Sequence, residues 1–540
     1  MTVMLSPGVY VVEKDVSDIV PTLASASAAI VGYSEKGSSE AITLITNNQQ
    51  FIQEYGEPDP SSGHYFHYAA LAYLARGNTL YCLRVENGAL FGGANIMTST
   101  SAETNAAFVT GKSSTDFAVA SGLEDDVLFQ IMGANPGTWN SNIGVYVENV
   151  EDGSEEVLTD QYTFDIVVYY QDEDGNYSEL ERWNVSRKEK VDGFGKDLYL
   201  EDKINGRSQY IVVADNTSIA DTVLPQEQAT RLDLGGGTNG AAITDSDLID
   251  GWDEFANPDD IDVRILINGG ETSVAVQNKM KTVAEGRADC FAVFDVPWSA
   301  AQSPTDTVTF RTTTQNFNTS YGALYAPWVQ IYDTYNDKLI FVPPSGHVAG
   351  QMAYNDFVGN PWNAPAGFRR GQLDVIQPSY TYSKGERDVL EAAQVNFIQM
   401  FRGEGTVIWA QKTLQKKTSA LSSVNVRRML IVIEKSMAVS IRPFLFENNN
   451  ATTRFRVKAL LDSYLEVLSA QGAFQTEAGD EGFLVVVDDT NNLPSVIDRL
   501  EMHVDVFLKP ARAAEKILLQ SIITPTGASF QELVARGQIF

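Results

Sequence analysis

The chain has 540 residues, of which 44% are hydrophobic, and a formal net charge of −31. No apolar run approaches the roughly 20 residues that span a bilayer, and no basic and then apolar leader opens the chain, so we expect synthesis in the cytoplasm and no direct membrane insertion. Two cysteines are too few for a disulfide framework, and the acidic balance argues against nucleic acid as a partner.

Residues 1–21 predict an extended N-terminal arm. Their one strand pattern is Val9, Tyr10, Val11 and Val12, and they carry too few apolar residues to form a core. Twenty extended residues span at most about 70 Å, which is enough to leave the parent domain and reach a neighbouring molecule.

Residues 22–90 and 235–395 predict an α/β middle domain. A strand over 263–267, a helix over 274–285 and a strand over 290–294 form a β-α-β unit, which predicts parallel strands with helices packed on the sheet.

Other elements of this domain have shorter signals. Strands are predicted within 22–33 and over 80–85, and a helix over 65–74. Ser383 and Glu386 have the spacing of a capping box and predict the start of another helix.

Residues 91–234 differ in composition from the flanking sequence and predict a β-rich, acidic insertion into the middle domain. Acidic residues, Asn, Gly and Thr multiply there, and strand patterns alternate with glycine-containing turns. The glycine cluster at 235–240 resembles a phosphate cradle, but no Gly-Lys-Ser/Thr follows and no helix begins directly after it, so we do not expect nucleotide binding.

Residues 396–508 predict an α+β C-terminal domain. Apolar residues recur at helical spacing over 426–437, which predicts a helix that leaves Arg427 and Arg428 off its buried stripe. A second helix is predicted over 457–468, with Gly472 as its C-terminal cap.

The rest of the sequence predicts two strands followed by a C-terminal arm. A buried strand is predicted over 483–487, and alternation of apolar and polar residues predicts a half-buried strand over 500–508. Residues 509–540 predict a C-terminal arm.

Basic residues concentrate in one window. Residues 401–460 carry eleven Lys or Arg against three acids, a charge of +8, so the other 480 residues sum to −39. Charge segregation on this scale predicts a macromolecular partner with a charged surface, because a small substrate needs only a few focused charges.

No motif in the sequence predicts catalysis. No HExxH zinc motif and no nucleophile elbow is present. His64 and His67 lie one turn apart and could hold a metal, but no third ligand is apparent in the sequence. We therefore expect no enzymatic activity, no cofactor and no metal. The four histidines are His64, His67, His347 and His503.

Several stretches together resemble the contractile tail sheath protein of bacteriophages and related contractile injection systems. No single motif is decisive, but they occur in the right order over nearly the whole chain. They are SPGVYVVEKD (6–15), LGGGTNG (234–240), YGALYAPWV (321–329), VPPSGHVAG (342–350) with Asp356, WNAPAG (362–367), GTVIWAQKTL (405–414), VNVRRMLIVIEKS (424–436), FENNN (446–450), GAF (472–474) and DDTNN (488–492).

The resemblance implies a structural subunit whose copies form hexameric discs, stacked helically around a tail tube. The C-terminal domain would lie inside, against the tube, and would be completed by exchanged terminal strands, whereas the insertion would lie outside. The implied N-terminal donor strand is Val9 to Val12. The implied C-terminal donor residues are Ile517, Leu518, Leu519, Ile522 and Ile523, and the implied receiving strand contains Met502, Val504, Val506 and Leu508.

The resemblance also implies partners. They are the tail tube protein and, at the ends of the stack, baseplate and neck or terminator proteins, within a virion assembled in the host cytoplasm. Our hypothesis for the tube contact is a set of basic residues that face an acidic tube through weak, screened pairs: Lys412, Lys416, Lys417, Arg427 and Arg428.

Other readings stay open at this point. One is a nucleotide-binding α/β enzyme that uses the glycine cluster, and another is a surface adhesin whose acidic insertion binds sugar or calcium. A third keeps the sheath but assigns it to an R-type bacteriocin instead of an infecting phage.

Overall fold

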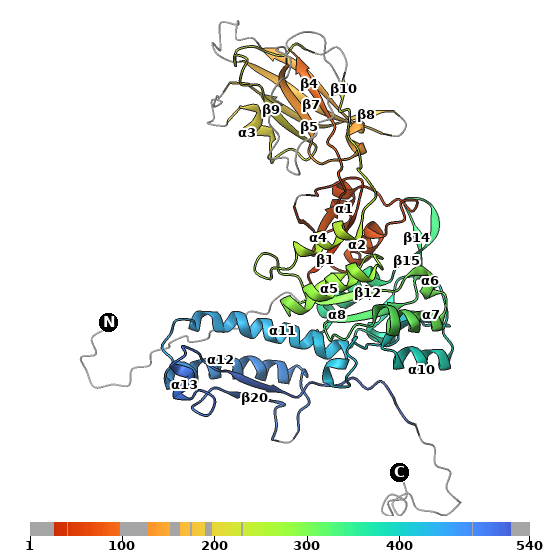
Figure 1. Ribbon diagram of the computed structural model, residues 1–540, viewed down its shortest axis with the longest axis vertical. Helices are drawn as coiled ribbons and strands as arrows, with labels where there is room; N and C mark the ends of the chain where they lie inside the picture. The colour runs from red at the N-terminus through yellow and green to blue at the C-terminus, as the bar shows by residue number, and fades with distance from the viewer. Residues whose placement is uncertain are drawn as a thin grey trace, which may run out of the picture.

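The computed structural model describes residues 26–39, 41–97, 127–151, 162–172, 175–188, 197–227, 231–477 and 479–519. The predicted strand at Val9 to Val12 and the donor residues Ile522 and Ile523 lie outside these ranges. Figure 1 shows three units: an outer β-rich unit on a narrow neck, a middle unit around a large sheet, and a C-terminal unit built on two long helices.

The middle unit is organised around a nine-stranded sheet with the order β16-β19-β18-β13-β12-β11-β1-β3-β2. The strands from β18 to β3 pair in parallel, and β2, β19 and β16 add antiparallel edges. The bounds are β1 Ala28–Tyr33, β2 Thr43–Ile45, β3 Leu80–Val85, β11 Ile265–Ile267, β12 Phe291–Asp295, β13 Gly322–Ala326, β16 Gln372–Leu373, β18 Val395–Phe401 and β19 Gly405–Ile408.

Helices cover both faces of this sheet because its buried strands are apolar on both sides. One core lies beneath α1 (Asn48–Tyr55), α2 (Phe66–Leu74) and α8 (Ser345–Val358). A second core lies beneath α4 (Asp245–Asp253), α5 (Val274–Arg287), α7 (Pro304–Thr309) and α10 (Lys384–Ala392).

Shorter elements complete the middle unit. They are α6 (Trp298–Ala301), a π-helical turn (Phe310–Gln315), α9 (Gly367–Arg370), and a small sheet of β14 (Val329–Asp333), β15 (Lys338–Val342) and β17 (Gln377–Pro378).

The predicted β-α-β unit is confirmed, since β11, α5 and β12 follow one another and the two strands pair in parallel. The predicted capping box is also confirmed: the Ser383 side chain accepts from the Glu386 backbone N–H, and the Glu386 carboxylate accepts from the Ser383 backbone N–H. The predicted domain boundary at 395/396 is wrong, because β18 and β19 belong to the nine-stranded sheet.

The outer unit contains two sheets around a core of its own. One sheet has the order β4-β5-β9, with β4 Gly93–Met97, β5 Val127–Gly133 and β9 Ile211–Asp215. The other has the order β10-β6-β7-β8, with β10 Leu232–Asp233, β6 Ile143–Glu151, β7 Thr163–Gln171 and β8 Tyr177–Val185. Helix α3 (Leu200–Ile204) and a 3-10 turn (Thr138–Asn142) accompany them.

The glycine cluster at 235–240 forms the neck between the outer and middle units. The two chain segments of the neck pair with each other, Leu90 opposite Thr238 and Gly93 opposite Gly235. A Cβ on Gly237 would lie 2.4 Å from the carbonyl oxygen of Gly137, so only glycine permits this close approach. The cluster therefore has a structural use in the described chain, which removes the reason for reading it as a phosphate cradle.

The C-terminal unit packs two long helices against a strand pair. Helices α11 (Val424–Ile441) and α12 (Ala451–Ala470) lie side by side in Figure 1, with β20 (Phe483–Val486), α13 (Pro494–Ile497) and β21 (Asp505–Leu508) after them. Two 3-10 turns, Ala420–Ser422 and Arg442–Phe444, flank α11.

Gly472 ends α12 as predicted. Its φ is +81°, its backbone N–H donates to the Ser469 carbonyl at 2.9 Å, and the Ala473 N–H donates to the Leu468 carbonyl at 3.0 Å. This is the Schellman motif, which satisfies the last carbonyl groups of the helix.

His67 on α2 is buried among aromatic rings and has a pH-dependent contribution to stability. Its Nε2 lies 3.2 Å from the Tyr55 carbonyl oxygen, which can only accept, so this nitrogen carries the proton. Burial lowers the pKa of His67 from 6.5 to about 4. Between those values the unfolded chain binds a proton that the folded chain does not, so stability is lost as the pH falls through this window.

We expect His67→Gln to weaken this pH dependence, because the amide can still donate to Tyr55 but does not titrate. Between about pH 7.5 and about pH 5, the wild-type protein should lose about 2 kcal/mol more unfolding free energy than the variant. Urea titrations of both proteins at each pH give this difference, in which contributions common to both proteins cancel. Equal losses of unfolding free energy in the two proteins would contradict the assignment of this pH dependence to His67.

Candidate functional site

The C-terminal unit holds a sheet of only two strands. β20 and β21 pair antiparallel, with Phe483 opposite Leu508 and Val485 opposite Val506. One face packs on α12, whereas Leu484 and Phe507 on the other face are 55% and 58% exposed. Among the described residues no third strand joins the pair. Two strands alone are marginally stable, and no described strand pairs with either outer edge. Side chains satisfy part of the β20 backbone, since the Val485 carbonyl accepts from Lys458 Nζ at 2.5 Å.

The predicted receiving strand is only partly a strand. β21 begins at Asp505, although Met502 and Val504 pack on the same core as Val506 and Leu508. The chain before Asp505 is held by a side chain instead of a strand, because the His503 backbone donates to Asn492 Oδ1 at 2.8 Å and the His503 carbonyl accepts from Asn492 Nδ2 at 2.9 Å. The prediction that the strand starts near residue 500 is therefore wrong.

The chain leaves this sheet as an extended arm. Lys509 and Ala511 still make backbone hydrogen bonds, to Gly482 at 2.8 Å and to Ala473 at 3.0 Å. From 512 to 519 the described chain makes no backbone hydrogen bond and belongs to no strand or helix. The predicted donor residues in this stretch are solvent-exposed. Ile517, Leu518 and Leu519 are 89%, 83% and 88% exposed.

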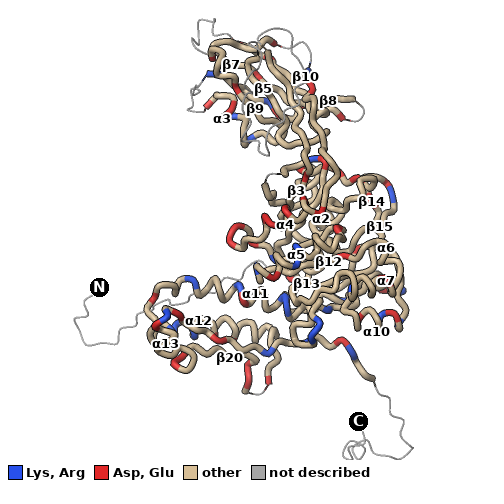
Figure 2. Tube along the Cα trace, viewed as in Figure 1, with Lys and Arg blue, Asp and Glu red and all other residues tan. Residues whose placement is uncertain are grey.

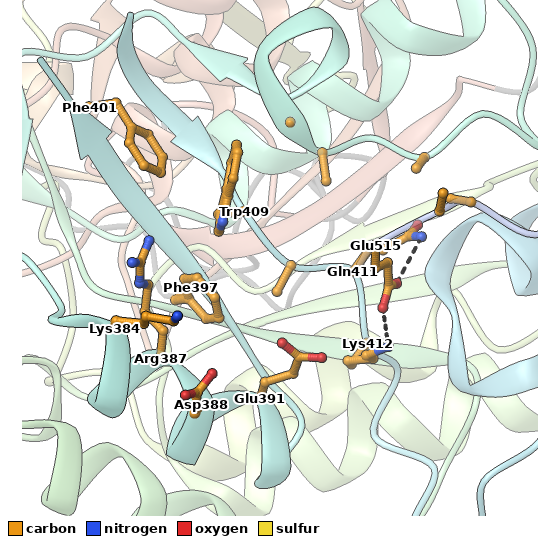
Figure 3. A pocket seen from close by; sticks show the side chains of 16 residues that line it. Lys384, Arg387, Asp388, Glu391, Phe397, Phe401, Trp409, Gln411, Lys412 and Glu515 are labelled. Atoms are coloured by element: carbon orange, nitrogen blue, oxygen red, sulfur yellow. Dashed lines mark hydrogen bonds and ion pairs between the residues drawn. The ribbon is translucent and has the colours of Figure 1, made fainter. Parts of the chain in front are cut away.

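Glu515 anchors the arm to the middle unit. Its carboxylate accepts from Lys412 Nζ at 2.6 Å and from Gln411 Nε2 at 3.2 Å, as the dashed lines in Figure 3 show. Lys516 lies 3.8 Å from Glu391 on α10. These contacts fix where the arm leaves the molecule, and they were not predicted because Glu515 lies 103 residues from Lys412.

The arm crosses the mouth of a groove of about 570 Å³ in the middle unit. The groove lies between α10 and the end of β19, and Figure 3 shows Lys384 and Arg387 on one side with Phe397, Phe401 and Trp409 beside them. Asp388 and Glu391 of α10 also line it, as do Lys412 and Glu515.

The prediction that Arg427 and Arg428 lie on an exposed basic face is wrong. They are 6% and 4% exposed, because α11 packs on the middle unit as well as on α12. Arg428 donates to both carboxylate oxygens of Asp356 on α8, with Nη1 3.0 Å from Oδ1. The Arg427 guanidinium lies 4.2 Å from the centre of the Tyr321 ring. Neither side chain is available to a tube.

Most of the basic window is neutralised inside the chain. Of the predicted tube-facing residues, Lys412 pairs with Glu515, and Lys416 Nζ donates to Asn316 at 2.6 Å. Lys416 and Lys417 are exposed. Further pairs from this window are Lys435 with Asp289, Arg442 with Asp259, Arg454 with Asp489 and Lys458 with Asp462. The formal charge of +8 over residues 401–460 therefore overstates the positive charge that is available to a partner protein.

Two of the histidines lie beside carboxylates. His64 Nδ1 lies 3.3 Å from Glu271, and His503 Nε2 lies 3.0 Å from Glu501. Across the described ranges no group of three His, Cys, Asp or Glu side chains could hold a metal ion. In the same ranges no helix combines the length and apolarity needed to cross a bilayer.

Two family models match the chain in succession. The model of the phage tail sheath protein central domain matches residues 241–414, and that of the phage tail sheath C-terminal domain matches residues 416–524. Their boundary falls after β19, in agreement with the sheet and not with the predicted boundary at 395/396.

Curated relatives carry the same description. The chain is 33% identical over 373 residues to the tail sheath protein of Enterobacteria phage T4, which covers 65% of this chain and 54% of that protein. It is 31% identical over 369 residues to the tail sheath protein of Vibrio phage KVP40, which covers 63% of this chain and 52% of that protein. The chain thus spans about half the length of these relatives.

Solved structures share the fold at low sequence identity. The sheath tail protein from Desulfitobacterium hafniense matches with a TM-score of 0.55 and 13% identity, over 89% of this chain and 94% of that one. The sheath complex of the extracellular contractile injection system PVC, in its contracted state, matches with a TM-score of 0.52 and 17% identity, over 97% and 98% of the two chains.

Proposed function

Because this chain belongs to the phage tail sheath family, we propose that it is the structural subunit of a contractile sheath. In this proposal its copies form hexameric discs that stack helically around a tail tube in a metastable extended state. Contraction then drives the tube through the envelope of the target cell.

One observation carries the proposal: the chain holds both a two-stranded sheet, which no third described strand joins, and an exposed arm at 512–519 that belongs to no strand or helix. No third described strand joins the β20–β21 pair, and the arm at 512–519 makes no backbone hydrogen bond and ends in the exposed apolar residues Ile517, Leu518 and Leu519. Adding such a segment to the edge of a neighbour's sheet would pair the open backbone groups and bury alternate apolar side chains.

Strand addition between copies supports a filament that changes length. Contacts in which one copy's arm enters the next copy's sheet are head-to-tail, and such contacts propagate a helix when they do not close a ring. If the strands stay paired while the linker at 509–516 bends beyond Ala511, whose backbone is still bonded to Ala473, copies can rotate and slide without separating. Contraction then releases free energy because the extended state is metastable.

Contact with the tube rests on fewer residues than the sequence predicts. Lys416 and Lys417 are the exposed members of the predicted basic set, and we propose them as tube-facing. Exposed pairs of this kind are worth about 0 to 1 kcal/mol each. A weak contact suits a sheath that must release its tube.

The remaining partners follow from the same proposal. Baseplate proteins and neck or terminator proteins would contact the two ends of the stack, and assembly would take place in the host cytoplasm. A role without catalysis is part of the proposal. Assignment to an infecting phage agrees with the two phage relatives named above.

Electron microscopy of the purified full chain tests this function. We expect hollow, cross-striated cylinders with six-fold symmetry in negative stain, because each copy supplies both the donor and the acceptor. A protein that stays a small single particle at every concentration and salt tested would contradict the proposal.

A further inference from the structure

Two cations that line the groove, Lys384 and Arg387, form no ion pair among the described residues, in contrast to Lys412, which pairs with Glu515. Lys384, Arg387, Phe401 and Trp409 line the groove together with the acids Asp388 and Glu391. Phe368 packs on Phe401 and Trp409, Arg369 and Arg370 follow it in α9, and Arg402 follows Phe401. We use the name basic groove for the eight residues Phe368, Arg369, Arg370, Lys384, Arg387, Phe401, Arg402 and Trp409. Within the described residues none of its five cations has a carboxylate oxygen within 4.0 Å, although most cations of the neighbouring window do.

Aromatic rings accompany these cations. Phe368, Phe401 and Trp409 pack on one another with ring centres 4.6 to 5.2 Å apart. Phe368 and Trp409 are nevertheless 42% and 36% exposed. Arginine next to aromatic rings is weakly hydrated and recognises carboxylates well, so the basic groove is chemically suited to an acidic protein surface.

A matching acidic surface lies on α4 and the loop after it. Residues 241–262 contain eight Asp or Glu and no Lys or Arg. Some of these acids have partners within the chain, such as Asp253 with Lys279 and Asp262 with Arg264. Asp250, Glu254 and Asp260 are exposed and take part in no ion pair among the described residues.

Helix α4 and the groove helix α10 lie towards opposite edges of the same face of the large sheet, and α9 contacts the strands β16 and β19 at the α10 end. α4 packs on β1 and β3, whereas α10 packs on β18, and both helices belong to the same core. Four strand steps of about 4.8 Å separate β1 from β18, so the surfaces cannot meet within one molecule. Figure 2 shows the acidic loop after α4 on the side of the middle unit that faces away from α10.

We propose that the basic groove of one copy binds the acidic surface of a second copy. Opposite charges at opposite edges make this contact head-to-tail, so it can repeat from copy to copy around a disc. It is a different contact from strand addition, because it uses the middle unit and not the β20–β21 sheet. The inference rests on the proposed function, since it assigns a lateral contact within the same assembly.

Charge reversal and charge exchange test this contact. We expect Asp250→Lys with Glu254→Lys to raise the protein concentration needed for cylinder formation by about tenfold or more, and Arg369→Glu with Arg370→Glu to do the same. The variant with all four substitutions should recover assembly, because the pairs are restored with opposite sign. Asp202→Lys with Asp221→Lys, on the outer unit, is the matched control and should assemble as wild type.

Chemical crosslinking adds a readout that does not depend on affinity. Cys82 and Cys290 are buried, so a chain with Glu254→Cys and Arg369→Cys offers two reactive thiols. A short bismaleimide should produce a ladder of covalent oligomers from assembled protein, and neither single cysteine variant should do so.

The outcomes separate this contact from the function on which it rests. If wild-type protein forms cylinders but the reversed variants assemble equally well, or if the four-fold variant does not recover, the lateral contact is overturned and the sheath function stands. If wild-type protein forms no cylinders, the proposed function fails and the contact fails with it.

Discussion

Replacing Asp356 with alanine is expected to lower the free energy of unfolding by about 3 to 5 kcal/mol. Asp356 and Arg428 form a two-pronged ion pair with side chains only 1% and 4% exposed. Removing the carboxylate leaves the buried Arg428 guanidinium without its ion-pair partner, which is strongly destabilising. The pair joins α8 of the middle unit to α11 of the C-terminal unit, so the loss should appear first as separation of these units.

A second variant distinguishes the loss of a charge from the loss of packing. Asp356→Leu combined with Arg428→Met removes both charges and keeps apolar bulk, and a buried pair replaced in this way is often close to neutral. We expect the double variant to be more stable than Asp356→Ala by at least about 2 kcal/mol in urea titrations followed by tryptophan fluorescence. A double variant as unstable as the single one would show that the charges are not the cause.

Aspartate substitutions in the arm are expected to abolish assembly in an alternating pattern. A strand added to a sheet edge directs successive side chains to opposite faces, so Ile517 and Leu519 share one face and Leu518 takes the other. Each apolar side chain that is buried on docking contributes about 1.5 to 3 kcal/mol to the free energy of association, and an aspartate in its place removes that contribution. The first set of substitutions is Ile517→Asp with Leu519→Asp, and the second is Leu518→Asp alone. One set should therefore prevent cylinder formation, whereas the other should reduce cylinder formation only slightly.

The isolated subunit serves as the control for the arm variants. Because these side chains are 83% to 89% exposed, the variants should unfold at the same urea concentration as wild type. Sedimentation of assembled protein and negative-stain images measure the effect on assembly. Equal damage from both sets, or no damage from either, would contradict strand addition by this part of the arm.

Features set by short-range chemistry could be predicted from the sequence. The strand over 80–85 has the predicted limits, and the capping box of Ser383 and the glycine cap of α12 form as predicted. Each of these features depends on residues that are close in sequence, so the local sequence pattern is enough to predict it. The β-α-β unit was predictable for the same reason, since its elements follow one another directly.

Features set by distant residues could not be predicted in this way. Arg428 looks like a surface residue in its own helix, and only Asp356, 72 residues away, explains its burial. The apolar spacing over 426–437 predicts a helix with one buried face. In the structure α11 is covered on two sides, by the middle unit and by α12. The Glu515 anchor and the true end of the large sheet likewise depend on partners that no spacing rule connects.

The paired neck has a practical consequence for protein engineering. Because the segments around Leu90 and Thr238 enter and leave side by side, the ends of the insertion are fixed next to each other. A foreign module whose own termini are adjacent could take its place without moving the sheet beneath, since insertions succeed at such positions. The neck is thus a ready grafting point for displaying enzymes or antigens in a regular array.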